Sequence, residues 1–122
     1  YAELDRMRAA GAAPVPMPPE TDTLDALRAA DAGALGQSLG NDLEAAAISL
    51  APYLRRTLDA GMELGSLGAV VSGSGPTCAF LVSDPADATR LAAALDAAGV
   101  CRTTRIATGP VHGARMVVPP AL

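Results

Sequence analysis

Two short apolar runs joined by a glycine- and serine-rich segment limit most strongly how this chain can fold. Residues 67–71 (LGAVV) and 78–82 (CAFLV) are typical of β-strands. The six residues between them are Ser72, Gly73, Ser74, Gly75, Pro76 and Thr77. Glycine has no Cβ, so this segment can turn tightly and approach a ligand closely. Its backbone N–H groups and three hydroxyls can bind an anion such as phosphate or carboxylate, whereas the alternative is a hairpin turn with purely geometric glycines.

The residues of this segment resemble a known family. Residues 71–80 (VSGSGPTCAF) resemble the third signature motif of the GHMP kinases, which act on small alcohols. Residues 40–47 (GNDLEAAA) and 1–5 (YAELD) are similar to two helices of that family, and residues 102–115 are similar to the closing strands of its actinobacterial members. The resemblance implies an α+β fold over 1–122. It would be a single ferredoxin-like GHMP kinase C-terminal domain, with helices packed on one face of a small antiparallel sheet.

The same resemblance carries an expected activity. It points to the subfamily that transfers phosphate from ATP, accompanied by Mg²⁺, to the 2-hydroxyl of 4-diphosphocytidyl-2-C-methyl-D-erythritol in the non-mevalonate isoprenoid pathway. Such kinases place a catalytic Asp, a Lys and the longer ATP loop in an N-terminal domain. All nine basic residues of this chain are Arg, so it has no Lys. We therefore expect the chain to be the C-terminal half of a two-domain kinase whose N-terminal domain would precede Tyr1. The chain would hold no catalytic residues, would be inactive alone and would have that domain as its partner.

The resemblance also suggests roles for the polar residues. We expect Gly73, Ser74 and Gly75 to abut the phosphate loop of the N-terminal domain. Ser72 and Thr77 would orient substrate or hold the segment, next to the rigid Pro76. A Gly75→Val substitution is expected to cost more activity than stability, because it would push a Cβ into the cleft.

Two interpretations remain open for the polar cluster Asn41-Asp42-Leu43-Glu44. Asn41 can cap a helix, with Glu44 reaching back to complete a capping box. Alternatively, Asn41 or Asp42 orients the glycine–serine segment. The sequence does not choose between these interpretations.

Composition excludes several other classes of function. The net charge of −4 and the scattered arginines argue against nucleic acid as a partner. No apolar run is long enough to span a membrane, so the bacterial cytoplasm is the expected location. Cys78 and Cys101 have neither a zinc nor a redox spacing, so we expect two buried structural thiols on separate strands and no metal site. His112 is predicted to be an exposed turn residue.

The remaining pattern predicts the other helices and strands. Predicted helices cover 1–8 and 31–39, and the helix between them can be capped by Asp22 or Thr23. Three more run from Asn41 to Leu50, from Pro52 to Gly61, and from the cap at Asp84 up to Gly99. Pairs of leucines expected to face the core are Leu24 and Leu27, Leu54 and Leu58, and Leu91 and Leu95. Residues 11–19 read as an irregular surface loop. Val100 to Thr108 reads as an edge strand, and 114–118 as a last short strand.

Two further functional hypotheses stay open at this stage. A homoserine or mevalonate-type kinase would share the fold and a glycine-rich third motif, although those versions usually lack the Pro-Thr that follows the glycines in this chain. A stand-alone ferredoxin-like ligand-binding module would bind its ligand without any partner domain. The oligomeric state is left open.

Overall fold

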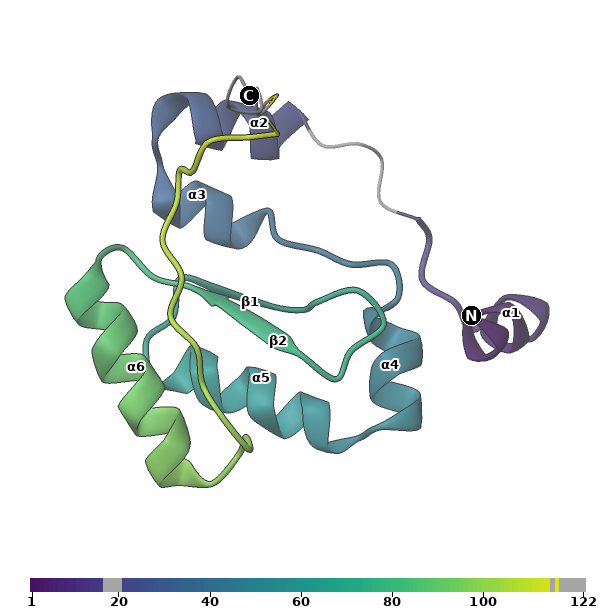
Figure 1. The fold of residues 1–122 in the computed structure, drawn as a ribbon. Coiled ribbons are helices and arrows are strands. Elements are labelled where there is room, and N and C mark those ends of the chain that lie inside the picture. Colours follow the sequence, from purple (N-terminus) through teal and green to yellow (C-terminus); the bar gives the residue numbers. More distant parts are fainter. Residues whose placement is uncertain (17–20, 115, 117–122) are drawn as a thin grey trace, which may run out of the picture.

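The computed structural model describes residues 1–16, 21–114 and 116 of the chain. In chain order, its elements are α1 (Ala2–Ala9), α2 (Thr21–Ala29), α3 (Ala32–Gln37), α4 (Glu44–Leu50), α5 (Tyr53–Glu63), β1 (Gly68–Val71), β2 (Cys78–Leu81) and α6 (Pro85–Ala98) (Figure 1). Helices that pack around a small antiparallel sheet make an α+β fold, so the predicted fold class is confirmed at that level. No helix in the described part of the chain is long and apolar enough to cross a membrane.

The predicted hairpin forms the centre of the domain. β1 and β2 pair antiparallel, with Gly68 opposite Leu81 and Val71 opposite Cys78. Successive residues of a strand point to opposite faces, so Val71 and Cys78 share one face of the sheet with Phe80. α5 packs against both strands, and α6 packs against α5. The hairpin therefore places the glycine–serine segment at one end of a sheet that α5 covers.

The core is small and aliphatic. Its buried cluster consists of Ala47, Leu54, Leu58 and Val71, contributed by α4, α5 and β1. Leu91 and Leu95 of α6 are also buried, so two of the three predicted leucine pairs face inward.

The third leucine pair lies elsewhere. Leu24 and Leu27 are 52% and 56% exposed, and Ala26 is the buried residue of α2. Leu24 and Leu27 were expected in the core, so that prediction is wrong. The described contacts of α2 are with α3, and they use the face that carries the smaller Ala26.

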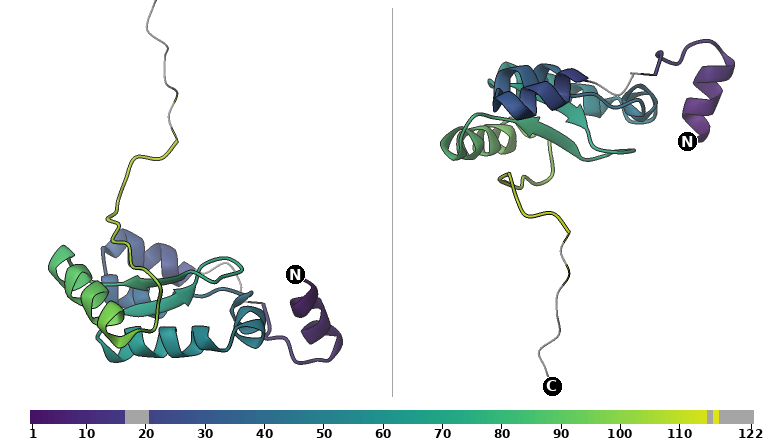
Figure 2. Two further views of the ribbon diagram at one scale, coloured as in Figure 1. Left: turned by 60° about the horizontal axis from the view of Figure 1, so that its bottom comes forward. Right: turned by 90° about the horizontal axis from the view of Figure 1, so that it is seen from above.

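α3 crosses β1 at a contact between two backbones. A Cβ added to Gly36 would overlap the carbonyl of Leu67, and a Cβ on Gly68 would overlap the carbonyl of Gly36. Both glycines are buried. In Figures 1 and 2, α3 and α5 lie on either side of the hairpin. The helices are therefore not confined to one face of the sheet, contrary to the expectation.

The predicted cap chemistry holds at α6 but not at α2, where Asp22 and Thr23 lie inside a helix that begins at Thr21. Asp84 accepts a hydrogen bond from the N–H of Asp87, 2.8 Å away, and Gly99 ends α6 with φ +64°. Asp31 caps α3 in the same way. The predicted end of α5 at Gly61 is wrong, because the helix continues to Glu63. Gly61 is the position where the ring of Phe80 packs against the helix, which accounts for the missing side chain.

The predicted strand from Val100 to Thr108 is also wrong. This segment is irregular, and the described sheet contains only β1 and β2. Side chains hold the segment instead of a backbone ladder. The Thr57 hydroxyl donates to the carbonyl of Val100 over 2.7 Å, and the Thr104 hydroxyl donates to the Asp96 carboxylate over 3.2 Å. The weak alternation of this stretch gave it no apolar face to place against the sheet.

Farther along, Ala114 and Met116 are irregular, and the rest of the predicted strand 114–118 lies outside the described residues. His112 is exposed, as expected.

α1 lies at the opposite end of the domain from α6 (Figure 2). It buries Leu4 and half-buries Met7, and it packs against α4. The Ser49 hydroxyl donates to the Glu3 carboxylate over 2.8 Å, which links the two helices.

Candidate functional site

The glycine–serine loop, residues 72–77, is closed by two backbone hydrogen bonds. The N–H of Ser72 donates to the Thr77 carbonyl over 2.8 Å, and the N–H of Gly75 donates to the Ser72 carbonyl over 3.0 Å. Gly73 and Gly75 have φ values of +57° and +75°, a region that side chains rarely adopt. The loop therefore needs glycine at both positions.

This folding leaves two adjacent donors free. The N–H groups of Gly73 and Ser74 have no partner among the described residues, and both residues are exposed. The hydroxyls of Ser72, Ser74 and Thr77 are likewise unpartnered within the described part of the chain, and all three residues are exposed. Consecutive free N–H groups with nearby hydroxyls can bind an anion. Gly75 is not part of this donor set, because its own N–H is used inside the loop.

Asn41 ties the loop to the start of α4. Its side-chain Nδ2 donates to the carbonyls of Val71 and Gly73, each 2.7 Å away. Its Oδ1 accepts from the N–H of Leu43 over 3.0 Å. Only this orientation of the amide satisfies two acceptors on one side and a donor on the other.

Of the two interpretations left open for the polar cluster at 41–44, the capping box is wrong. α4 begins at Glu44, has Leu43 at its N-cap position and has no side-chain cap. Glu44 does not reach back to Asn41, because its Oε2 accepts the N–H of Val71 over 3.0 Å. Asn41 and Glu44 therefore hold the β1 end of the loop from both the carbonyl and the N–H side. Asp42 lies between them with its side chain exposed.

The expected place for a Gly75 side chain is also wrong. A Cβ on Gly75 would lie 3.3 Å from Val71 Cγ1 and 3.5 Å from Leu54 Cδ1, in the core and away from the exposed side of the loop. A substitution there would disturb the packing of the core. By contrast, a Cβ on Gly73 would meet no atom within 4 Å. A substitution at Gly73 therefore changes the loop without disturbing the packing of the core.

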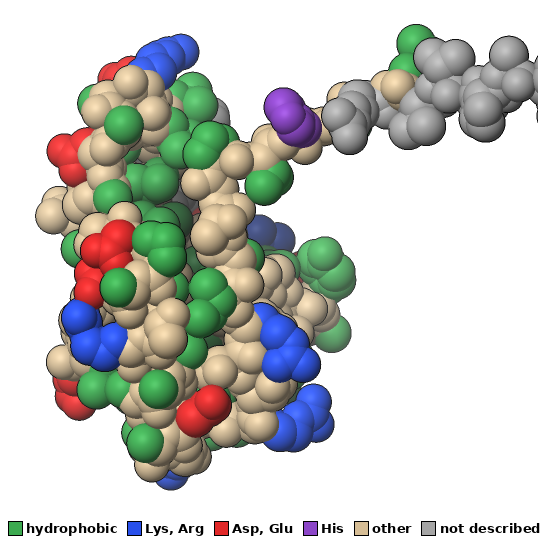
Figure 3. Space-filling model, turned by 60° about the vertical axis from the view of Figure 1, so that its left-hand side comes forward, with side chains coloured by type: hydrophobic (Ala, Val, Ile, Leu, Met, Phe, Trp, Pro, Cys, Tyr) green, Lys and Arg blue, Asp and Glu red, His purple; other side chains and the backbone are tan. Residues whose placement is uncertain are grey.

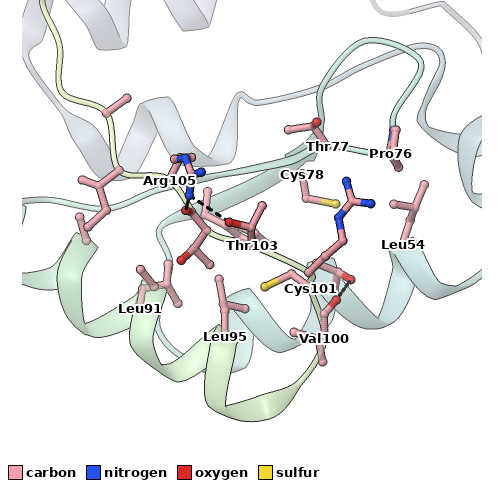
Figure 4. A pocket seen from close by; sticks show the side chains of 18 of the residues that line it. Leu54, Pro76, Thr77, Cys78, Leu91, Leu95, Val100, Cys101, Thr103 and Arg105 are labelled. Atoms are coloured by element: carbon pink, nitrogen blue, oxygen red, sulfur yellow. Dashed lines mark hydrogen bonds between the residues drawn. The ribbon is translucent and has the colours of Figure 1, made fainter.

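A cavity of about 590 Å³ adjoins the loop at Pro76 and Thr77. Its apolar lining includes Leu54, Phe80, Val82, Leu91 and Leu95, and residues 100–107 form another wall. Figure 4 shows Leu91 and Leu95 of α6 on one side of the cavity and Pro76 and Thr77 on another. Sequence reasoning missed this cavity, because it took the wall-forming segment for a strand.

Both cysteines line this cavity as free, half-buried thiols. Burial raises the pKa of the Cys78 thiol, and the charges of Glu44 and Cys101 raise it further. Burial also raises the pKa of Cys101, with the nearby Asp96 carboxylate adding to the effect. Cys78 lies on β2, as expected, but Cys101 lies in the irregular segment and not on a strand. Neither thiol is fully buried, so the expectation of two buried thiols is wrong.

Comparison with known proteins agrees with the resemblance seen in the loop. Over 117 residues the chain is 55% identical to a 4-diphosphocytidyl-2-C-methyl-D-erythritol kinase of Rhodococcus jostii (strain RHA1), covering 96% of the chain and 37% of that protein. It is 54% identical over 116 residues to the kinase of the same name from Salinispora tropica, covering 95% of the chain and 37% of that protein. The match to the one from Mycobacterium tuberculosis (strain ATCC 25177 / H37Ra) is 52% over 120 residues, covering 98% of the chain and 37% of that protein.

The chain therefore spans a little over a third of the length of the curated relatives that it matches. The matched region is their C-terminal part, and the relatives are mainly actinobacterial, as the closing residues 102–115 suggested. Residues 23–101 match the family described as GHMP kinases C terminal, a span that contains the glycine–serine loop and both residues that hold it. The chain belongs to the GHMP kinase family and represents its C-terminal domain.

Proposed function

We propose that this chain is the C-terminal domain of an ATP-dependent kinase that phosphorylates the 2-hydroxyl of 4-diphosphocytidyl-2-C-methyl-D-erythritol in the non-mevalonate isoprenoid pathway. The printed name of its relatives supports this substrate over that of a homoserine or mevalonate-type kinase. The catalytic groups would belong to an N-terminal domain outside residues 1–122, and the bacterial cytoplasm, which supplies ATP, is the expected location. The sheet would be part of the ferredoxin-like arrangement of that family.

One observation carries the proposed role of the chain. The loop presents the free N–H groups of Gly73 and Ser74 side by side on an exposed surface. Phosphoryl transfer depends mainly on positioning and on stabilising charge at the phosphate oxygens, so donors fixed in advance contribute without acid–base chemistry. These two N–H groups would donate to phosphate oxygens. The hydroxyls of Ser72 and Thr77 would orient the substrate, and Pro76 would restrict the backbone beside them.

Fixed donors need a fixed loop, and Asn41 and Glu44 provide one. The amide of Asn41 and the carboxylate of Glu44 together bind both backbone groups of Val71 and the carbonyl of Gly73. These bonds lie on the α4 side, so the exposed donors stay available. We infer that Asn41 is a positioning residue for the loop. Asp42 would add negative charge at the start of α4, where the helix dipole favours it.

The chain itself fits ATP phosphates better than it fits a metal ion. Among the described residues, no group of three or more His, Cys, Asp or Glu side chains could hold a metal. No step of the proposal therefore uses Mg²⁺ held by this chain. Mg²⁺ would accompany the ATP, held outside residues 1–122.

A matched pair of glycine substitutions in the full-length protein tests the proposal. Gly73 and Gly99 have φ values of +57° and +64°, and a Cβ at either one meets no atom within 4 Å. Alanine should therefore cost similar stability at both, about 1–2 kcal/mol. ADP formation is measured with 4-diphosphocytidyl-2-C-methyl-D-erythritol as the acceptor. We expect Gly73→Ala to lower kcat/KM at least about tenfold, because the donors move, and Gly99→Ala to leave it unchanged.

The outcomes separate the alternatives. If both variants keep wild-type kinetics, the loop is only a turn. If the wild-type protein phosphorylates homoserine or mevalonate and not the proposed acceptor, the other kinase hypothesis replaces this one. If residues 1–122 alone bind a ligand tightly, the stand-alone module replaces both.

A further inference from the structure

The cavity beside the loop has the lining of a small-molecule site. Its volume of about 590 Å³ lies within the range of about 300–1,000 Å³ that ligand sites occupy. Its floor is apolar, with Phe80 and Val82 from the hairpin side and Leu91 and Leu95 from α6. Such a lining favours the apolar part of a ligand.

The charged lining residues are all of one sign. Arg102 and Arg105 line the cavity, and none of the lining residues is acidic. This stands out in a chain with a net charge of −4. Two carboxylates lie close to lining residues without lining the cavity. Asp96 of α6 accepts from the Thr104 hydroxyl and, at 3.7 Å, from the Cys101 thiol. The charge of Glu44 acts on Cys78. In the face drawn in Figure 3, two basic groups lie at the lower right, and others lie at the top and at the left, where most of the acidic side chains are.

One of the two arginines makes hydrogen bonds only to neighbours in its own segment. Arg105 uses only its Nη1, which donates to the Thr103 hydroxyl over 3.0 Å and to the Thr104 carbonyl over 2.8 Å (Figure 4). Its remaining guanidinium nitrogens have no partner in the described part of the chain. Arg102 is exposed and makes no described hydrogen bond or ion pair. Guanidinium groups with free N–H donors bind carboxylate, sulfonate or phosphate.

We propose that this cavity binds a small amphipathic anion, with its apolar body between β2 and α6 and its acidic group at Arg102 and Arg105. The wall formed by residues 100–107 suits such a site. Its described attachments to the rest of the domain run through the Thr57 and Thr104 hydroxyls and the Cys101 thiol, so the wall can adjust around a guest. The proposal depends on the cavity and not on the proposed kinase activity.

Two fluorescent probes with the same ring system test the proposal in the full-length protein. 8-Anilinonaphthalene-1-sulfonate has an apolar body and one acidic group, and N-phenyl-1-naphthylamine has the same rings without the acid. We expect Arg102→Gln combined with Arg105→Gln to raise the Kd of the sulfonate at least about tenfold, because charge-assisted hydrogen bonds are lost. The Kd of the neutral probe should stay the same. Arg56→Gln is the matched control, since Arg56 is exposed, lies outside the cavity and has no described partner.

Cys101 reports where the probe binds. Its thiol lines the cavity, so bound sulfonate should slow alkylation of Cys101 by iodoacetamide, read by mass spectrometry of the peptide that contains it. Protection of Cys101, together with an arginine effect confined to the sulfonate, supports the site. An equal loss for both probes, no arginine effect, or no protection of Cys101 would each overturn it. None of these readouts uses kinase activity, so a failure of the site is distinct from a failure of the proposed function.

Discussion

Replacing Asn41 with aspartate isolates the hydrogen bonds that hold the loop. Aspartate keeps an oxygen for the N–H of Leu43, but it replaces the Nδ2 donor with a second oxygen. That oxygen would face the carbonyls of Val71 and Gly73, which are both 2.7 Å from the present nitrogen. Two bonds are lost, each worth about 0.5–1.5 kcal/mol, and repulsion is added. We expect Asn41→Asp to lower the free energy of unfolding by about 3 kcal/mol at pH 7.

Asn41→Ala is the reference for this measurement. Alanine removes all three hydrogen bonds but adds no repulsion, so its cost should be about 2–3 kcal/mol. Urea unfolding of the full-length protein gives both values, and a loss of 3 kcal/mol lowers the midpoint by at least about 1 M. The free energy of unfolding of Asn41→Asp should therefore be no higher than that of Asn41→Ala. If Asn41→Asp is clearly more stable than Asn41→Ala, then the bond to Leu43 dominates, and the idea that Nδ2 holds the loop is wrong.

The pH dependence of Asn41→Asp adds an independent check. Facing two carbonyl oxygens, the new carboxyl group is stabilised in its protonated form, which can donate to one of them, so its pKa in the folded protein should rise. Its destabilising effect is then fully present above that raised pKa. It should shrink as the pH falls toward the unfolded value of about 3.9. A stability difference from wild type that does not narrow between pH 7 and pH 4 would contradict this account.

Two further substitutions and one titration follow from the packing of the helices. Gly61→Ala should destabilise the protein by about 1–3 kcal/mol, because its Cβ would overlap the ring of Phe80. Gly33→Ala, at a helical glycine with room for a Cβ, should instead stabilise it by up to about 1 kcal/mol. If both substitutions stabilise the protein in thermal unfolding, the Phe80 contact is not tight. Hydrogen bonding from Arg6, more than any other cause, lowers the pKa of Glu3 from 4.5 to about 2. Because the folded value lies below the unfolded one, this carboxylate stabilises α1 and, through Ser49, its contact with α4 above about pH 4.5, and the effect is lost as the pH falls toward 2. Arg6→Gln should move the NMR titration midpoint of Glu3 back toward 4.5, and an unchanged midpoint would contradict the assignment.

The parts of the fold that the sequence predicts well are those with local causes. The hairpin follows from two apolar runs around a glycine turn, and α6 follows from the cap at Asp84 and the left-handed Gly99. These signals act within a few residues, so a single sequence contains them. The family resemblance, which matching relatives confirm, also rested on the local sequence of the loop.

The errors arise where distant residues decide the structure. Glu44 has the spacing of a capping box, but the N–H of Val71, 27 residues away, takes its carboxylate. Gly61 reads as a helix stop, yet its missing side chain makes room for Phe80 on another element. Val100 to Thr108 contains β-branched residues, which favour a strand, but it pairs with no strand in the described part of the chain. The cavity was missed for the same reason, since its walls come from segments that no local pattern joins.

The hydrogen bonds of Asn41 also limit the order in which parts of the domain can fold. The hairpin needs only neighbouring residues and can pair early. The amide of Asn41, in contrast, lies 30 residues before Val71 and 32 residues before Gly73, the two residues whose carbonyls it binds. Loop closure over such distances has an entropic cost that must be met before the contact forms. A hairpin that forms before Asn41 is in place would therefore have a loop in which the N–H groups of Gly73 and Ser74 are not yet held in one position. A ligand that binds the N–H groups of Gly73 and Ser74 only in the folded state therefore stabilises the domain, by an amount that grows with the logarithm of the ratio of its free concentration to its Kd.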